Sequence, residues 1–254
     1  TGHMILVNQF INFMSDNRSF RDLFLVVIQF GSILAVVTLY FHKLNPFSPS
    51  KTMHEKADTW SMWLKVLVAC VPAGVIGLLF DDMIDTYLYK ASVVAATLII
   101  YGIAFIIIEN MHRVPSADSI GAITYKTAAF IGVFQVLSLI PGTSRSGATI
   151  LGAVILGCSR TVAAEFSFFL AVPIMLGASG LKIFKYLLES GTFSVNEITI
   201  LIIGMAVAYF VSILAIKFLI DYIRKHDFKI FGWYRILLGI AVIIYFTISH
   251  AKVI

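Results

Sequence analysis

The chain has few charged residues, few cysteines, and no long charged or low-complexity segment. Only 13% of its 254 residues are charged, whereas 59% are hydrophobic and the mean hydropathy is +0.92. A water-soluble domain of this length cannot bury so much apolar surface, so lipid is the expected solvent. Because no linker interrupts the pattern, one polytopic membrane domain over residues 1–254 is predicted.

The scarcity of cysteine and of basic runs excludes further classes of function. Cys70 and Cys158 both lie in apolar runs, which favours small core or lipid-facing residues over a disulfide or a metal site. The formal net charge is +5, and no basic run is long enough, or interleaved with aromatic residues, to indicate nucleic-acid binding. The lysines and arginines are instead typical of the loops of a membrane protein.

Six apolar segments are long enough to cross a bilayer, which takes about 20 residues. Two runs at 127–140 and 148–157 are too short and flank a polar turn. Half-length helices around such a break predict a re-entrant hairpin, because irregular backbone at membrane depth must be buried in protein or line a cavity. A third short run, 4–13, resembles the returning arm of a second hairpin. The expected spans are approximately 23–41, 63–80, 91–109, 164–184, 198–220 and 234–249.

The basic residues near the ends of these spans are divided unequally between the two sides of the membrane. Twelve fall on the side that holds the loops 42–62, 110–126 and 221–233, and six fall on the other side, with Arg145 left out of the count. The positive-inside rule makes the first side cytoplasmic and puts both ends of this chain outside.

The order of the segments predicts an all-α fold with an inverted-topology repeat. A half-helix and three spans are followed by a hairpin and three more spans, and an odd number of spans makes the second unit enter from the opposite face. The expected repeats are about 1–124 and 125–254, with the site near the midplane where the hairpins meet. Small-residue echoes between 30–35 and 176–180 fit such a repeat, although small residues also serve helix packing.

The polar turn, with the sequence PGTSRSGAT, combines groups that bind phosphate. Pro141 ends the incoming helix, and Gly142 permits a sharp turn. The second helix is expected to begin near Ser146, so that its free N–H groups and positive dipole end point into the turn. Arg145 adds a permanent charge on a planar fork. The expected phosphate-binding residues of the turn are Gly142, Thr143, Ser144, Arg145, Ser146 and Thr149.

Arg145 has no acidic residue near it in sequence, and a cation at membrane depth costs roughly 2.5–3.5 kcal/mol on insertion scales. An anionic ligand is the simplest compensation. The alternative is an N-cap by one hydroxyl, with the arginine side chain extending to the membrane surface. Gln135, inside the first half-helix, also needs a partner and is interpreted either as a polar residue of the site or as a helix–helix hydrogen bond.

Together with other segments, the turn resembles the bacterial undecaprenyl pyrophosphate phosphatases, a membrane family linked to bacitracin resistance. The resemblance implies inverted repeats with two re-entrant hairpins in the bacterial cell membrane. It also implies hydrolysis of the lipid diphosphate to the monophosphate and inorganic phosphate at the outer face, which recycles the carrier for peptidoglycan synthesis. Besides the turn, the similar segments are 1–5, 27–32, 71–74, 165–168, 171–173 and 234–235.

The resemblance also implies roles for individual residues. Arg145 would clamp the diphosphate, Ser144 would be a nucleophile or a phosphate ligand, His3 would be the catalytic histidine, and Thr1 would bind phosphate beside it. The family's paired glutamates, the expected ligands of Mg²⁺ or Ca²⁺, are not in this sequence, so no metal ligand is expected in it. We therefore expect the native protein to be longer at its N-terminus, and the sequence without that arm to bind phosphate poorly and hydrolyse little.

The remaining acidic residues are not expected to replace these ligands. Glu109 and Glu165 are interpreted as solvated helix ends, and Asp81, Asp82 and Asp85 as an acidic loop.

The expected mechanism is in-line attack on the terminal phosphorus, with Ser144, His3 or water as the nucleophile.

Because inverted repeats with broken helices are also typical of secondary transporters, a transporter or flippase of a lipid phosphate or another anion is the alternative function. A purely structural subunit would leave Arg145 unexplained. The expected partners are a polyprenyl diphosphate and the bilayer, without nucleic acid, and a homodimer is left open.

Overall fold

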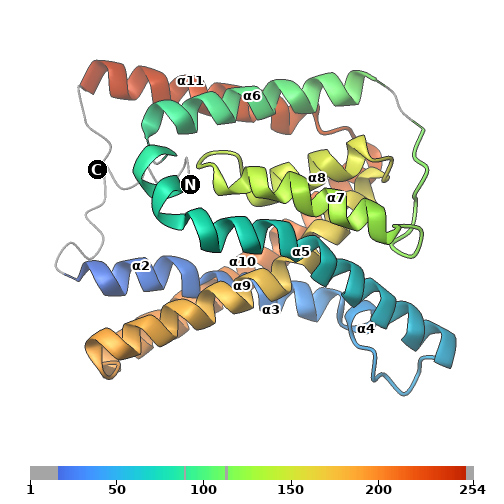
Figure 1. Cartoon of the computed structure of the whole chain (residues 1–254), viewed down its shortest axis with the longest axis horizontal. Helices are drawn as coiled ribbons and strands as arrows, with labels where there is room; N and C mark the ends of the chain where they lie inside the picture. The colour runs from blue at the N-terminus through green and yellow to red at the C-terminus, as the bar shows by residue number, and fades with distance from the viewer. Residues whose placement is uncertain (1–16, 89, 112–113, 250–254) are drawn as a thin grey trace. The chain divides into compact units, whose positions relative to one another are not determined.

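A computed structural model of the chain describes residues 17–88, 90–111 and 114–249, and these residues form an all-helical fold (Figure 1). Within these ranges six helices are long and apolar enough to cross a membrane, which confirms the predicted fold class. They extend beyond most of the expected apolar segments because helical hydrogen bonding continues into the polar flanks. The spans are Ser19–Leu39, Met53–Phe80, Ala91–Asn110, Arg160–Glu189, Val195–Lys225 and Lys229–Ile248.

The first span consists of two helices, α2 (Arg18–Val27) and α3 (Gln29–Leu39), and the short α4 (Phe41–Leu44) follows. Asn17 caps α2 by accepting a hydrogen bond from the backbone N–H of Phe20 at 3.0 Å. Such a cap satisfies a donor that has no partner within the helix.

The second long helix, α5 (Met53–Leu88), starts with a capping box. The Thr52 N–H donates to Glu55 Oε2 at 2.7 Å, and the Glu55 N–H donates to Thr52 Oγ1 at 3.3 Å. The helix departs from helical geometry at Phe80 (φ −123°, ψ 15°) and then continues. The prediction of an acidic loop at Asp81, Asp82 and Asp85 is therefore wrong, because helical backbone resumes after the kink.

After α6 (Ala91–Asn110) the chain forms the predicted pair of half-length helices, α7 (Tyr125–Val136) and α8 (Arg145–Ile155), with the 3₁₀ turn η1 (Leu137–Leu139) between them. The incoming arm ends before Pro141, as predicted. Ile140 is extended (φ −75°, ψ 121°), the conformation that a following proline imposes. Gly142 then adopts φ +89°, which favours glycine.

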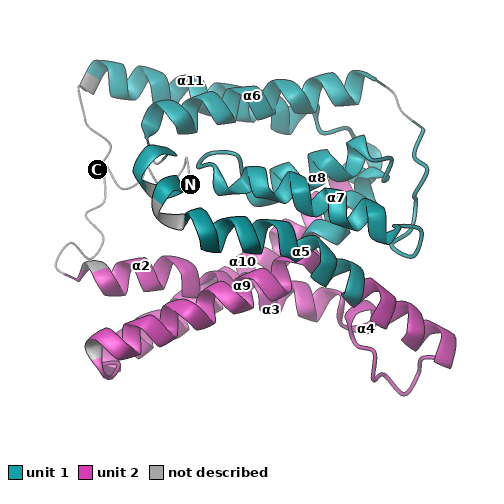
Figure 2. Ribbon diagram, viewed as in Figure 1, with its two compact units in different colours: residues 1–11, 64–167, 223–254 teal, residues 12–63, 168–222 magenta. Residues whose placement is uncertain are grey.

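Three long helices complete the chain: α9 (Arg160–Ser190), α10 (Val195–Lys225) and α11 (Lys229–Ser249). The fold divides into two compact units (Figure 2). Within the described residues, one unit consists of 64–167 and 223–249, and the other consists of 17–63 and 168–222. Both units draw on both halves of the chain, and the predicted repeats at about 1–124 and 125–254 stay a prediction.

The first unit contains the hairpin and the paired helices α6 and α11, which run side by side in Figure 1. These two helices approach closely because a glycine on each faces the other. A Cβ atom at Gly102 would lie only 2.7 Å from the carbonyl oxygen of Gly232, and one at Gly232 would lie 2.7 Å from that of Gly102. A buried apolar cluster also packs between them, formed by Val94, Ala95, Leu98 and Val242. The pair is therefore a tightly packed support for the hairpin beside it.

The second unit has its own apolar cluster of Phe20, Leu23, Val27, Tyr186 and Leu201. Polar groups also link its helices. The Ser212 hydroxyl donates to Ser32 at 2.8 Å, and the Tyr186 hydroxyl donates to Glu197 at 2.7 Å. Such pairs satisfy polar groups that lipid cannot.

Candidate functional site

The turn between α7 and α8 has an unusual backbone at its centre. Ser144 is the N-cap of α8 and has φ +69°, ψ 123°, a conformation that residues other than glycine rarely adopt. Its Oγ accepts a hydrogen bond from the Gly147 N–H at 3.3 Å and lies 3.3 Å from the Ser146 Oγ. The helix begins at Arg145, next to the expected Ser146. Its first N–H groups, which lack intrahelical acceptors, therefore point into the turn.

Side chains from α6 and α11 bind three consecutive carbonyl groups of this turn. The Thr97 hydroxyl donates to the Pro141 carbonyl oxygen at 2.8 Å. Arg235 Nη2 donates to the carbonyl oxygens of Gly142 at 2.8 Å and Thr143 at 2.7 Å. The acceptors of this irregular backbone are thus satisfied within the protein, as burial at membrane depth requires.

Arg235 was not predicted as a site residue, although it lies in the segment 234–235 that contributes to the family resemblance. In the structure it lies about 9 Å along α11 from the helix start, at about 1.5 Å per residue. Its guanidinium lies 5.7 Å from the centroid of the Tyr101 ring. Arg145 was singled out as an arginine in a polar turn between two short apolar runs, whereas Arg235 stands at the expected start of a span, at 234–249, and gave no such signal. Thr97 had no comparable signal, because a threonine is unremarkable in a helix.

Arg145 is partly exposed, and the alternative in which its side chain extends to the membrane surface stays a prediction. Its Nη1 atom is buried and has no hydrogen-bond partner among the described residues. The capping part of that alternative is right, since Ser144 caps α8. In the part of the chain that the structure describes, neither Arg145 nor Arg235 forms an ion pair with a carboxylate.

Within the described ranges, four buried side-chain polar atoms lack a hydrogen-bond partner, and all four belong to this hairpin or to the arginine bound to it. They are Gln135 Oε1, Thr143 Oγ1, Arg145 Nη1 and Arg235 Nε. A buried polar atom without a partner is costly, so such atoms are rare and call for an explanation. Their concentration at one turn indicates a place prepared for a polar ligand.

Two predicted site residues have partners within the protein. Thr149 is buried, with its Oγ1 3.0 Å from the Arg145 carbonyl oxygen and 2.7 Å from Ser167 Oγ. Gln135 donates through Nε2 to the Ala69 carbonyl oxygen on α5 at 3.4 Å. The helix–helix hydrogen bond considered for Gln135 is therefore present, while its Oε1 remains unpartnered.

The structure brings five of the predicted residues together at the turn: Gly142, Thr143, Ser144, Arg145 and Ser146. Ser144 is exposed and Thr143 is fully buried. His3 and Thr1, which the family resemblance singled out, lie outside the described residues. The candidate site, as far as the described residues form it, therefore consists of hydroxyls, helix N–H groups and guanidinium groups.

These groups do not fit a divalent cation, which favours carboxylate and carbonyl oxygens. The turn carbonyls are bound by Thr97 and Arg235, and no group of three or more His, Cys, Asp or Glu among the described residues could hold a metal ion. Glu109 and Glu165 are buried, so their interpretation as solvated helix ends is wrong. Both glutamates stand at the ends of apolar runs, and this position in the sequence does not show whether a side chain is buried.

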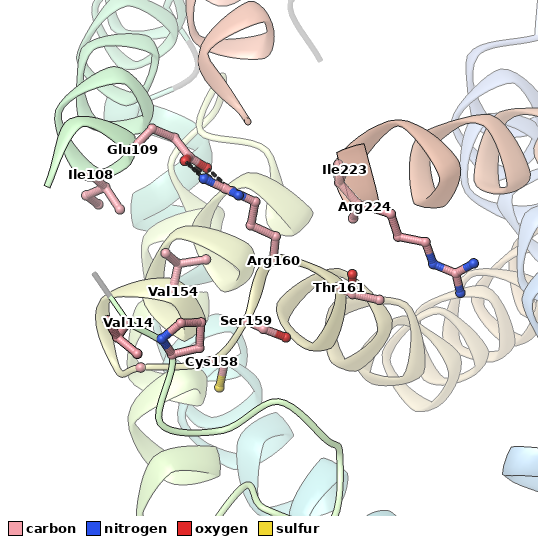
Figure 3. Close-up of a pocket in the computed structure, with 12 residues that line it drawn as sticks. Ile108, Glu109, Val114, Val154, Cys158, Ser159, Arg160, Thr161, Ile223 and Arg224 are labelled. Atoms are coloured by element: carbon pink, nitrogen blue, oxygen red, sulfur yellow. Dashed lines mark hydrogen bonds and ion pairs between the residues drawn. The ribbon is translucent and has the colours of Figure 1, made fainter. Parts of the chain in front are cut away.

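A separate cavity of about 310 Å³ lies at the opposite end of α8, where the chain connects to α9 (Figure 3). Glu109 and Arg160 point toward one another at its edge, whereas the Arg224 side chain points away from them. Cys158 also lines this cavity, and both cysteines of the chain are free, as predicted. None of the predicted site residues lines the cavity, so it is distinct from the turn.

The chain is similar to known proteins over nearly its whole length. The family model described as bacitracin resistance protein BacA matches residues 1–241. The undecaprenyl-diphosphatase of Enterococcus faecalis (strain ATCC 700802 / V583) is 58% identical over 98% of this chain and 91% of its own length. That of Lactiplantibacillus plantarum is 54% identical over 98% and 91%. Undecaprenyl-diphosphatase 1 of Clostridium acetobutylicum is 56% identical over 98% and 90%. The chain therefore belongs to the bacitracin resistance protein BacA family.

Proposed function

We propose that this protein is a membrane-bound phosphatase that hydrolyses undecaprenyl diphosphate to undecaprenyl phosphate and inorganic phosphate. The names of its relatives support this hydrolase function over the alternative of a transporter. The observation that carries the proposal is the turn at 141–147, where the buried Nη1 atom of Arg145 has no hydrogen-bond partner among the described residues and the start of helix α8 lies beside it.

The chemistry of the turn matches a phosphate group. A guanidinium fork can bind two phosphate oxygens at once, and the N-terminus of α8 adds N–H donors and a positive dipole end. These interactions strengthen as negative charge builds up on the phosphate oxygens during attack, because the donors are already oriented and shielded from water. Arg145 and the start of α8 therefore serve as the stabilising groups of the reaction.

The nucleophile is one of three groups. The Ser144 hydroxyl is exposed at the tip of the turn, next to Arg145, and is suited either to attack or to binding the phosphate. Attack by Ser144 would form a phosphoserine and release the lipid phosphate, and water would then hydrolyse the phosphoserine. The other candidates are His3 and a water molecule. His3 would act as the base when Ser144 attacks and as the general acid for the lipid phosphate when water attacks.

The proposal includes a divalent cation, Mg²⁺ or Ca²⁺, which would neutralise phosphate oxygens when bound. Because the described residues do not fit such an ion, no step above depends on it. The proposal also includes a site that opens to the outer face of the cell membrane. The twelve-to-six division of basic residues supports this orientation.

The test is phosphate release by the full-length protein purified in detergent, with undecaprenyl diphosphate as the substrate. We expect one inorganic phosphate and one undecaprenyl phosphate for each substrate molecule consumed, identified by mass spectrometry of the lipid. The same protein in liposomes is assayed for movement of the lipid between leaflets. Translocation without any phosphate release would refute the phosphatase and support the transporter.

A further inference from the structure

We propose that Arg235 is a positioning residue for this reaction, because it holds the turn so that N–H groups, and not carbonyl groups, face the phosphate. The expected effect of Arg235 on catalysis rests on the proposed phosphatase function, whereas its hydrogen bonds to the turn do not depend on that function. Arg235 stands on α11 and binds the backbone of the turn, and we do not propose that it contacts the substrate.

The carbonyl groups of the turn accept hydrogen bonds from Arg235 and Thr97, which fix their direction. Arg235 Nη2 binds the oxygens of Gly142 and Thr143 at 2.8 and 2.7 Å, immediately before the N-cap Ser144. A carbonyl oxygen carries partial negative charge and repels a phosphate oxygen. By binding both acceptors with one guanidinium group, Arg235 keeps them from turning into the place where an anion would bind. Thr97 does the same for the Pro141 carbonyl.

The backbone that follows these two peptide groups is strained. Ser144 has φ +69°, and such a conformation persists in a residue with a side chain only where the surrounding structure imposes it. The two hydrogen bonds from Arg235 hold the peptide groups directly before this residue. The orientation of the first N–H groups of α8 depends on the same peptide groups, so the hold on the carbonyls also aims the donors.

The two helices that carry Arg235 and Thr97 are packed closely together. Arg235 and Thr97 stand on α11 and α6, which are in close backbone contact at Gly102 and Gly232. The Arg235 guanidinium lies near the Tyr101 ring of α6. Gly147 leaves it room, because a Cβ atom there would lie 3.2 Å from Arg235 Nη1. The side chain is thus held between two packed helices and the start of α8.

The test compares Arg235→Gln and Arg235→Lys with the wild type in the full-length protein, with Lys229→Gln as the matched control. Lys229 stands at the start of the same helix, six residues before Arg235, and its Nζ lies 3.5 Å from Asp227. We expect Arg235→Gln to lower kcat roughly 10²-fold with a change in KM of less than about threefold, because a small misplacement of stabilising groups acts on the transition state. Arg235→Lys keeps a charge and several donors and should recover part of kcat.

Hydrogen–deuterium exchange without substrate separates this role from others. We expect the amides of 143–148 to exchange faster in Arg235→Gln while peptides from α6 and α11 keep their protection. A rise in KM with unchanged kcat and unchanged exchange would overturn the proposal in favour of a direct substrate ligand, and unchanged kcat and exchange would leave Arg235 without a role. Loss of protection throughout the protein in both variants would instead show a purely structural role.

A second variant keeps the test decisive if Arg235→Gln does not fold. Thr97→Val removes the donor to Pro141 and nearly preserves shape, and it should lower kcat and increase exchange at the turn in the same direction but less. No effect on either quantity would count against the proposal. If the wild type releases no phosphate, the phosphatase function fails, whereas the exchange experiment still decides whether Arg235 orders the turn.

Discussion

Arg160 binds Glu109 through one edge of its guanidinium group, with Nε 2.9 and 3.1 Å from the two carboxylate oxygens and Nη2 2.5 Å from one of them. The backbone N–H of Phe228 donates to the same carboxylate at 3.1 Å. The Glu109 side chain is 4% exposed, whereas that of Arg160 is 45% exposed. One buried carboxylate therefore joins the end of α6, the start of α9 and the segment before α11. Figure 3 shows the pair of Glu109 and Arg160.

This asymmetry predicts that removing the arginine is worse than removing the glutamate. Arg160→Gln leaves a buried carboxylate without its cation, which should lower the free energy of unfolding by about 3–5 kcal/mol. Glu109→Gln leaves an arginine that water still reaches, and it should cost only about 1.5–3 kcal/mol. Thermal unfolding in detergent measures both losses.

The double variant Glu109→Gln/Arg160→Gln is the internal check on this prediction. It should be more stable than Arg160→Gln alone, because the unpaired buried charge is gone. Glu189→Gln, at an exposed position near the end of α9, is the matched control and should be neutral. Equal losses in the two single variants would contradict the assignment of Glu109 as the buried partner.

Arg145 is predicted to be the residue whose loss most weakens phosphate release. Arg145→Ala should lower kcat/KM about 10³-fold or more, because a prepared charge at the reacting group is removed. Arg145→Lys keeps the charge but loses the planar fork and should be intermediate. Lys126→Ala removes a cation from the exposed start of α7, on the same hairpin, and should leave kcat/KM unchanged. Full activity in Arg145→Ala would refute the phosphate-binding turn.

Much of the fold could be predicted from the sequence because apolar length is a property of single segments. The six spans and the half-length pair α7 and α8 follow from runs of hydrophobic residues and from the punctuation at Pro141 and Gly142. The error at Asp81, Asp82 and Asp85 has a local cause. Polarity was taken to end a helix, whereas the chain bends at Phe80 and then resumes helical hydrogen bonds.

The site was predicted only where its residues are consecutive. The turn residues from Gly142 to Ser146 stand next to each other in sequence, so their chemistry was visible together. Arg235 and Thr97 reach the turn only through the packing of α6 on α11, which depends on contacts between segments far apart in sequence. The burial of Glu109 was missed for the same reason, since its partner Arg160 is brought near it by the connection between α8 and α9.

The Cys158 thiol is predicted to react slowly near neutral pH. Burial raises its pKa to about 11, compared with about 8.5 for an unperturbed thiol. Because the thiolate is the reactive form, alkylation by iodoacetamide should rise about tenfold per pH unit up to roughly pH 10. Mass spectrometry of the peptide distinguishes it from Cys70. Because the pKa of this thiol is higher in the folded than in the unfolded protein, its burial also contributes to stability. That contribution is fully present below about pH 8.5 and is lost as the pH rises toward 11. A rate that levels off near pH 9 would contradict the prediction.

Ser144 combines a cap, a strained backbone and an exposed hydroxyl, and two substitutions separate these properties. Ser144→Ala loses the hydrogen bond to the Gly147 N–H and keeps a side chain at φ +69°, so it should cost about 1 kcal/mol of stability. Ser144→Gly also loses the cap hydroxyl, but glycine adopts positive φ without strain and should be the more stable of the two.

If the hydroxyl takes part in the reaction, both variants lose phosphate release to a similar degree despite their different stabilities. Activity that follows stability, recovering in Ser144→Gly, would instead limit Ser144 to shaping the turn and leave His3 or water as the nucleophile. Unfolding midpoints and initial rates measured on the same preparations distinguish these outcomes.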